Sequence, residues 1–491
     1  MHFGGIDYAI LLIYLAAMVW IGFLFAGKQK TADDFFLAGR KMPWLAVAMS
    51  MYASLTSAVT YMGLPGLAYR SNVTLLAVAV VSPLLAPILI FLFYPTYRKL
   101  GITTSYEYIG IRFGPAARHT AAMLFLFARL GWMATVIYAP ALALSIATGL
   151  PLVFSILTMG LLATLYTVMG GLAAVLWTDV VQFVTLIGGA VLVAVFLTHA
   201  APDGVSGIIA FAKEHDHLQL DGSLSLWRMT LTGVAISFFF QMMQDYGTDQ
   251  VTVQRLLSTK TKGGMAKAIL FNSGVDFCII TLLLFIGLGL FAYYQGNADA
   301  LPDGIDGDRI FPYFIAHVLP NGVSGLLIAA IFAAAMSSMD SGINSMATVV
   351  VNDFIFPMFG KREDARAVRL ARIVTALLGV LATGLSIYLF FFTGAKGIIE
   401  TFAMFMGLFS APVLALFVLG LLTKRGSFGA WIPAALLSIG FTTWLQTTEV
   451  SWIWYFPTGF AVTFVIAWLL SLLITRSRIR EACPTKPPQN L

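Results

Sequence analysis

The segment 333-AAAMSSMDSGINSMATV-349 lies inside a long apolar run, yet it carries four serines, an aspartate, an asparagine and a threonine. Ser337, Ser341, Asn344 and Thr348 recur at intervals of four, three and four residues, which places them on one face of a helix. Apolar side chains recur at similar intervals on the opposite side. The segment is therefore predicted to be a helix with one polar stripe and one apolar stripe.

The polar stripe cannot face lipid, because each unsatisfied polar group in hydrocarbon costs several kcal/mol. Small hydroxyl residues often hold membrane helices together, so one or two serines would indicate helix contact alone. A stripe that also includes Asp340 indicates a functional site, because ionisable residues inside spans are costly. The ligand atoms are all oxygen, with no Cys or His nearby. Oxygen ligands suit hard cations, and mostly neutral ones favour a monovalent ion, so Na⁺ is the predicted ligand.

The composition is that of a membrane protein. The chain has 491 residues, of which 59% are hydrophobic and 11% charged, with a mean hydropathy of +0.87. Ordinary soluble domains are roughly 45–50% apolar and about 25% charged. Two cysteines are too few for a disulfide framework. The sequence therefore predicts an all-α, polytopic protein whose main partner is the lipid bilayer.

Thirteen membrane spans are expected, and they are helices because alternating period-2 patterns are nearly absent. The expected spans are 5–26, 44–70, 74–97, 119–148, 151–169, 177–199, 229–251, 266–293, 319–350, 367–392, 398–422, 430–447 and 451–474.

The basic residues predict the orientation. With the N-terminus outside and the C-terminus cytoplasmic, 23 of the 29 Lys and Arg residues fall on the inner side, among them Arg255. This skew agrees with the positive-inside rule and supports the span count. The expected location is the plasma membrane, with a bacterial inner membrane favoured. The charge is spread along loop edges instead of gathering on one face. Nucleic acid is therefore not an expected partner.

Two further spans contain polar interruptions. In 53-ASLTSAVTYMGLPGLAY-69, four hydroxyls precede Gly-Leu-Pro-Gly, and the span 229–251 ends in 241-QMMQDYGTDQ-250, interrupted at Gly247. A broken helix exposes backbone carbonyls to an ion, and such a pair of broken helices is typical of inverted-repeat transporters. Asp179 shares a face with Gln182, and it is either a helix cap or part of an ion site.

Several motifs together resemble the sodium/solute symporter family. They are 106-YEYIGIRFG-114, 170-GGLAAVLWTDVVQ-182, 249-DQVTVQRLLSTK-260 and 330-AIFAAAMSSMDSGINSMAT-348. The segments 50-SMYASLTSAVTYMGLPGLAYR-70 and 138-YAPALALSIATG-149 look most like the branch that moves monocarboxylates, vitamins and iodide, and parts resemble bacterial sialic acid symporters.

The resemblance implies a five-plus-five inverted-repeat (LeuT-like) core. It implies one transporter domain, 1–475, that divides into an extra first helix and loop at 1–43, repeats at 44–199 and 229–422, and two additional helices at 430–474. A cytoplasmic tail follows at 476–491.

The resemblance also implies the sodium sites. The main Na⁺ would be bound by the backbone carbonyls of Ala53, Thr56 and Ala334 and by the hydroxyls of Ser337 and Ser338. A second Na⁺, present in some members, would lie near Asp179, Asp340 and Ser341, with Ser337 close by. Those members have serine where this chain has Asp340.

The expected function is symport, in which inward Na⁺ flow drives uptake of a small organic solute by alternating access. An organic acid or monocarboxylate is favoured, and a sugar, a sialic acid or an amino acid is the alternative. A passive channel is the competing class. Missing catalytic motifs disfavour an enzyme or sensor, and no obligatory protein partner is expected.

The solute is expected at mid-membrane between the second, third, fourth and seventh spans. The candidate contacts are Ser57, Thr60, Arg129, Trp132, Gln241, Gln244 and Asp245. Trp132 falls where sialic acid symporters carry a carboxylate-binding arginine, and Leu55 and Ala79 replace polar residues, which makes a smaller or less polar solute the expectation. Arg129, one turn away, either pairs with an acid such as Asp245 or Asp276 or binds a solute carboxylate.

Overall fold

The computed structural model describes residues 4–25, 28–295, 301–302, 305, 307–360, 364–392 and 398–473, and every regular element in these ranges is helical. The first helices are α1 (Gly5–Phe25), α2 (Ala32–Leu37), α3 (Trp44–Leu55), α4 (Ala58–Arg70), α5 (Leu76–Ile88), α6 (Tyr94–Leu100), α7 (Ser105–Phe113), α8 (Pro115–Thr148), α9 (Leu152–Ala200) and α10 (Gly204–Glu214). The later ones are α11 (Leu231–Gly247), α12 (Gln250–Leu257), α13 (Lys262–Gln295), α14 (Ile310–His317), α15 (Val323–Val349), α16 (Phe356–Phe359), α17 (Asp364–Phe392), α18 (Ile398–Phe405), α19 (Ala411–Leu422), α20 (Phe428–Leu445) and α21 (Tyr455–Leu473). The expected tail, 476–491, lies outside the described residues.

The all-helical, multi-span architecture is confirmed, but the count of thirteen spans is not. Within the described ranges, ten helices are long and apolar enough to cross a membrane, and an eleventh span results if the bent pair α3–α4 is counted as one. Each remaining expected segment also contains helix. The first part of α9, 152–165, is an apolar stretch of fewer than eighteen residues that precedes a kink at Gly171, and α11 has 17 residues. The division into repeats at 44–199 and 229–422 stays a prediction.

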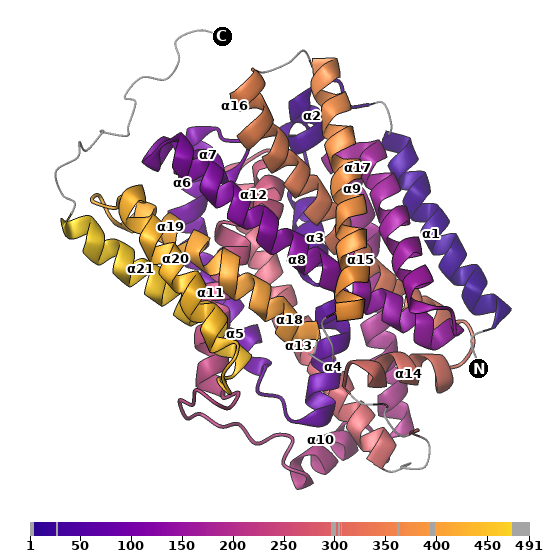
Figure 1. Cartoon of the computed structure of the whole chain (residues 1–491). Coiled ribbons are helices and arrows are strands. Elements are labelled where there is room, and N and C mark those ends of the chain that lie inside the picture. Colours follow the sequence, from indigo (N-terminus) through magenta and orange to yellow (C-terminus); the bar gives the residue numbers. More distant parts are fainter. Residues whose placement is uncertain are drawn as a thin grey trace.

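The helix that carries the polar stripe is the most deeply buried of the candidate membrane spans. Every residue of α15 from Leu327 to Val349 is buried, and α15 packs against α9, α8, α1 and α3. Figure 1 shows α15 inside the bundle, with α1 on one flank and α20 and α21 on the opposite flank. Because protein surrounds this helix on all sides, its polar groups meet other side chains instead of lipid.

The second span is broken, but not at the predicted position. The helix stops at Leu55 and restarts at Ala58 with a bend of 58°, and Thr56 between them has φ −84° and ψ 89°. The Gly-Leu-Pro-Gly segment was the expected break, yet Pro65 lies inside the continuous helix α4. α13 packs closely here, because a Cβ on Gly287 would approach the Pro65 carbonyl oxygen to 2.4 Å. Close packing of neighbouring helices allows proline inside a span.

The predicted interruption near Gly247 is confirmed. Helix α11 ends at that residue, and α12 begins at Gln250 after the two-residue break Thr248–Asp249. The Asp249 side chain accepts a hydrogen bond from the Val251 backbone N–H at 2.8 Å and so caps α12. The chain thus contains two broken spans, each with a polar residue at the break.

Candidate functional site

The break between α3 and α4 lies directly against the polar stripe of α15. The Ser337 hydroxyl donates to the Ala53 carbonyl oxygen at 2.7 Å and lies 3.2 Å from the Ala334 carbonyl oxygen. The Ser338 hydroxyl donates to the Ser54 carbonyl oxygen at 2.9 Å. The last carbonyl oxygens of a helix have no hydrogen-bond donor within that helix, and here hydroxyls from α15 donate to them.

Three of the five predicted ligands of the main Na⁺ therefore come together: Ala53, Ala334 and Ser337. Ser338 is adjacent but contacts Ser54 instead. Thr56, the fifth, lies at the break itself and faces a neighbouring cavity. The donor set consists of neutral oxygens, which fits a small monovalent cation.

The candidate second ion site already contains a positive charge from the protein. The guanidinium of Arg255, on α12, donates to Asp179 Oδ2 at 3.2 Å and to the Ser50 hydroxyl at 2.8 Å, and it also bonds to Ser341. Both Arg255 and Asp179 are fully buried. From the sequence, Arg255 was expected among the basic residues of an inner loop, but the structure places it inside the bundle.

Hydroxyls complete this cluster. Asp179 also accepts from Ser50 at 2.5 Å and from Ser54 at 3.3 Å, and Ser341 donates to Asp340 at 3.1 Å. Asp179, Asp340 and Ser341 are thus neighbours, as predicted. A cation in this region would share it with the guanidinium, so Na⁺ at the second site stays a prediction.

The C-terminal part of the polar stripe connects helices. The Gln254 side-chain amide, on α12, donates to the Asn344 side-chain oxygen at 2.9 Å, the Thr348 hydroxyl at 3.0 Å and the Phe36 carbonyl oxygen at 2.5 Å. These groups join α2, α12 and α15. The stripe therefore has two roles: its first half faces the helix break, and its second half holds helices together as membrane interfaces commonly do.

A cavity adjoins the α3–α4 break. It has about 150 Å³ of room for the centres of water molecules, on the order of ten times what a single water requires. Of the predicted solute contacts, five line it: Ser57, Thr60, Trp132, Gln241 and Asp245. Thr56 lines it too, so the candidate ion site and the cavity share a residue. A small organic solute fits a cavity of this kind.

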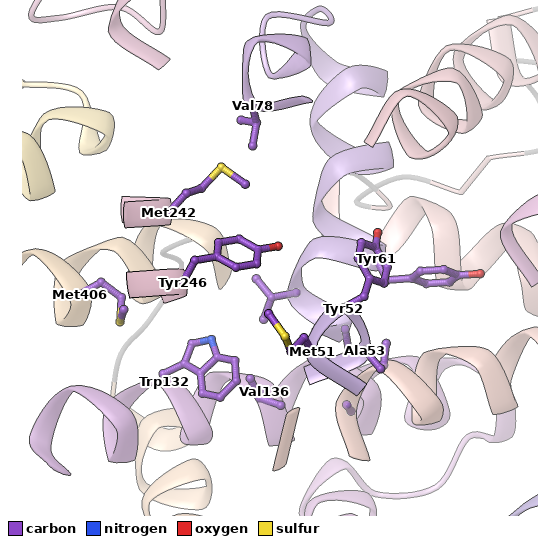
Figure 2. Close-up of a cluster of buried hydrophobic side chains, with 14 of the residues drawn as sticks. Met51, Tyr52, Ala53, Tyr61, Val78, Trp132, Val136, Met242, Tyr246 and Met406 are labelled. Atoms are coloured by element: carbon purple, nitrogen blue, oxygen red, sulfur yellow. The ribbon is translucent and has the colours of Figure 1, made fainter. Parts of the chain in front are cut away.

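Several lining residues were not predicted as solute contacts. They include the aromatic residues Tyr52, Phe238, Tyr246 and Trp452 and the carboxylate of Asp276. Figure 2 shows Trp132, Tyr246, Met242 and Val78, which come from three different helices, around the same space. Within α11, Phe238, Gln241 and Asp245 are spaced at three and four residues, so this face was readable from the sequence. Tyr52 and Trp452 belong to distant segments, and no local pattern marks them.

Arg129 does not line the cavity. It forms a buried ion pair with Asp249, the capping residue of α12, and lies 4.3 Å from the Trp132 ring centroid. Gln244 donates to the same Asp249 carboxylate at 3.1 Å. The ion-pair alternative for Arg129 is therefore correct, but the expected partners Asp245 and Asp276 were wrong. Arg129 and Gln244 connect α8 to the broken α11–α12 span.

Comparison with known proteins gives the family. A sequence profile described as the sodium:solute symporter family matches residues 35–432. The chain belongs to this family. The sodium/sialic acid symporter SiaT of Proteus mirabilis is 34% identical to it, over 89% of this chain and 88% of that one. The sodium/sialic acid symporter NanT of Aliivibrio fischeri is 31% identical over 95% and 93%.

A monocarboxylate transporter and two solved structures are also similar to this symporter. The bovine sodium-coupled monocarboxylate transporter 2 is 30% identical over 89% of this chain and 72% of that one. A solved Na⁺-coupled sialic acid symporter, substrate-bound and outward-open, superposes with a TM-score of 0.89 at 30% identity, over 96% and 98% of the two chains. Mhp1, a nucleobase-cation symporter bound to a hydantoin, has a TM-score of 0.57 at 14% identity and shows a shared fold alone. Membership places this chain among Na⁺-coupled membrane transporters and not among enzymes.

Proposed function

We propose that this symporter couples Na⁺ entry to uptake of a small organic solute by alternating access, with Na⁺ held between the α3–α4 break and α15. The observation that carries the proposal is the approach of the Ala53 and Ala334 carbonyl oxygens to one hydroxyl, that of Ser337. Each Na⁺ that enters gains about 2.3 kcal/mol per 100 mV of membrane potential. Because Thr56 belongs to both places, an ion at the break would order one wall of the solute cavity.

Among the anionic solutes, the comparisons favour a sialic acid over a monocarboxylate. The two bacterial relatives named as sialic acid symporters match more of their own length than the bovine monocarboxylate transporter does. The cavity gives weaker support to either anion, because none of its lining residues is Lys, Arg or His. The proposal also includes the orientation, with the N-terminus outside and the C-terminus inside. It includes no obligatory protein partner.

The test is Na⁺-dependent thermal stabilisation of the purified protein, with K⁺ as the reference ion. Ser337→Ala removes a predicted ligand and is expected to weaken the apparent Na⁺ affinity by about tenfold or more. Ser345→Ala is the matched control, because its hydroxyl, on the same helix, donates only to the Gly342 carbonyl of its own helix. Equal Na⁺ responses of the two variants would disprove the assignment. Solute uptake that persists at full rate without a Na⁺ gradient would identify a channel instead.

A further inference from the structure

A second, smaller groove opens on the surface of the bundle, between the start of α13 and α6 with the turn that precedes it. Its lining residues include Arg98 on α6 and Lys262 on α13, and none of them is Asp or Glu. The other lining residues are Tyr94 and the apolar Ile90, Pro95, Met265, Ala266 and Ile269. The groove has about 60 Å³ of room for the centres of water molecules, roughly four times what a single water requires. It is a basic site with apolar walls, and it shares no lining residue with the solute cavity.

The Arg98 guanidinium has backbone partners but no carboxylate partner in the described ranges. It donates to the Lys260 carbonyl oxygen at 2.8 Å, and it lies 3.4 Å from the Thr259 carbonyl oxygen and 3.3 Å from the Met265 sulfur. These contacts connect α6 to the segment between α12 and α13. Neither Arg98 nor Lys262 forms an ion pair with any described residue. Two positive charges therefore border a groove whose walls supply no negative charge.

The surroundings of the groove place it at the boundary between hydrocarbon and lipid headgroups. Figure 1 shows α6 at the end of the bundle opposite to α10 and α14. Phe91, just before α6, and Leu270 on α13 are 80% and 58% exposed, so apolar side chains next to the groove face lipid. At the same level of α13, Lys267 Nζ lies 5.8 Å from the ring centroid of the partly exposed Trp44. Tryptophan is enriched at membrane interfaces, and lysine extends its charge toward them.

The helix that carries Arg98 also holds the broken α11–α12 span. The chain before α6 is wound as a π-helix, Leu89–Phe93, a rare form that often lies at functional sites. Tyr94 and Tyr97, both on α6, donate their hydroxyls to the last carbonyl oxygens of α11, and the bond from Tyr97 to Gly247 is 2.7 Å long. A ligand bound to Arg98 would therefore stabilise the helix that holds the end of α11.

We propose that this groove binds an anionic phospholipid. The lipid phosphate lies between Arg98 and Lys262, and an acyl chain extends along Ile90 and Ile269. Basic pockets between membrane helices bind anionic headgroups in this way. A zwitterionic phospholipid carries an ammonium group that offsets its phosphate, so it gains less from the two basic side chains. The site is separate from the proposed Na⁺ and solute sites and does not depend on the proposed symport.

Two phospholipids with the same acyl chains provide the test. Dioleoylphosphatidylglycerol and dioleoylphosphatidylcholine are titrated into the purified full-length protein in a neutral detergent. Native mass spectrometry measures the bound lipid, and the unfolding midpoint measures stabilisation. The anionic lipid should bind about 20-fold more tightly and raise the midpoint, because each of the two basic residues contributes about fivefold.

Variants of the two basic residues locate the site. Lys262→Gln and Arg98→Gln should each reduce the preference for the anionic lipid by about fivefold. Arg98→Lys retains the positive charge and should keep most of the preference. Because the preference is a ratio of two affinities measured on the same variant, a general loss of stability in Arg98→Gln does not alter it.

The control is Lys424→Gln, the same charge change at an exposed residue in the loop after α19 that does not line the groove. It should leave the preference unchanged. The proposal is overturned if the parent protein binds both lipids equally. It is also overturned if Lys424→Gln reduces the preference as much as Lys262→Gln does, because binding would then follow overall charge. Inorganic phosphate at the lipid concentration should not raise the midpoint, and an increase equal to that of the anionic lipid would identify a free-anion site instead.

Discussion

Loss of the buried ion pair between Arg255 and Asp179 should lower stability strongly, because both side chains are fully excluded from solvent. Arg255→Gln removes the guanidinium bond to Asp179 at 3.2 Å and the bond to Ser50 at 2.8 Å. Asp179 then keeps only hydroxyl partners, Ser50 and Ser54. A carboxylate without a cationic partner would remain inside the bundle.

Removing one partner of a buried ion pair typically destabilises a protein by about 3–5 kcal/mol, and the two remaining hydroxyl donors place the expected loss near the lower end. The double variant Asp179→Asn/Arg255→Gln removes both charges and should recover on the order of 1 kcal/mol or more relative to Arg255→Gln alone. The measurement is the unfolding midpoint in detergent of the parent protein, Asp179→Asn, Arg255→Gln and the double variant, and this double-mutant cycle gives the coupling between the two side chains.

The control is Arg112→Gln. The Arg112 guanidinium donates to the carbonyl oxygens of Gly420, Thr423 and Lys424 and has no carboxylate partner among the described residues. Arg112→Gln should lower the free energy of unfolding by only about 1 kcal/mol. The charge-pair reasoning is refuted if Arg255→Gln lowers stability no more than Arg112→Gln does and the double variant is no more stable than Arg255→Gln.

Two further predictions concern other buried contacts. Arg129→Gln should lower the free energy of unfolding by about 3 kcal/mol or more, because the ion pair with Asp249 is lost. If the variant is fully stable and only its solute preference changes, Arg129 is a solute contact instead. Asp7→Ala should lower the free energy of unfolding by about 1–2 kcal/mol, because Asp7 accepts hydrogen bonds from the Gly322 and Gly325 backbone N–H groups at 2.7 Å and caps α15. Asp7→Asn keeps an acceptor oxygen and should lower stability less. Equal loss of stability in the two variants would contradict the capping role.

The sequence alone determined the membrane class, the helical architecture, the two broken spans and the polar stripe of α15. These properties depend on local composition and on periodicity, which neighbouring residues carry. The position of the first break was wrong, because Pro65 stays helical where α13 packs against it, whereas the chain breaks at Thr56–Ser57. Local propensity was overridden there by packing between helices far apart in sequence.

Only the tertiary structure decided which charges meet. Asp179 and Arg255 are neighbours, and Arg129 pairs with Asp249, which stands 120 positions further along the chain. Asp245 lines a cavity whose aromatic walls come from distant segments. Pairing of buried charges depends on distances of a few Å between helices, and no periodicity in one segment encodes such distances. Which buried charges pair with one another is therefore a property of the folded protein.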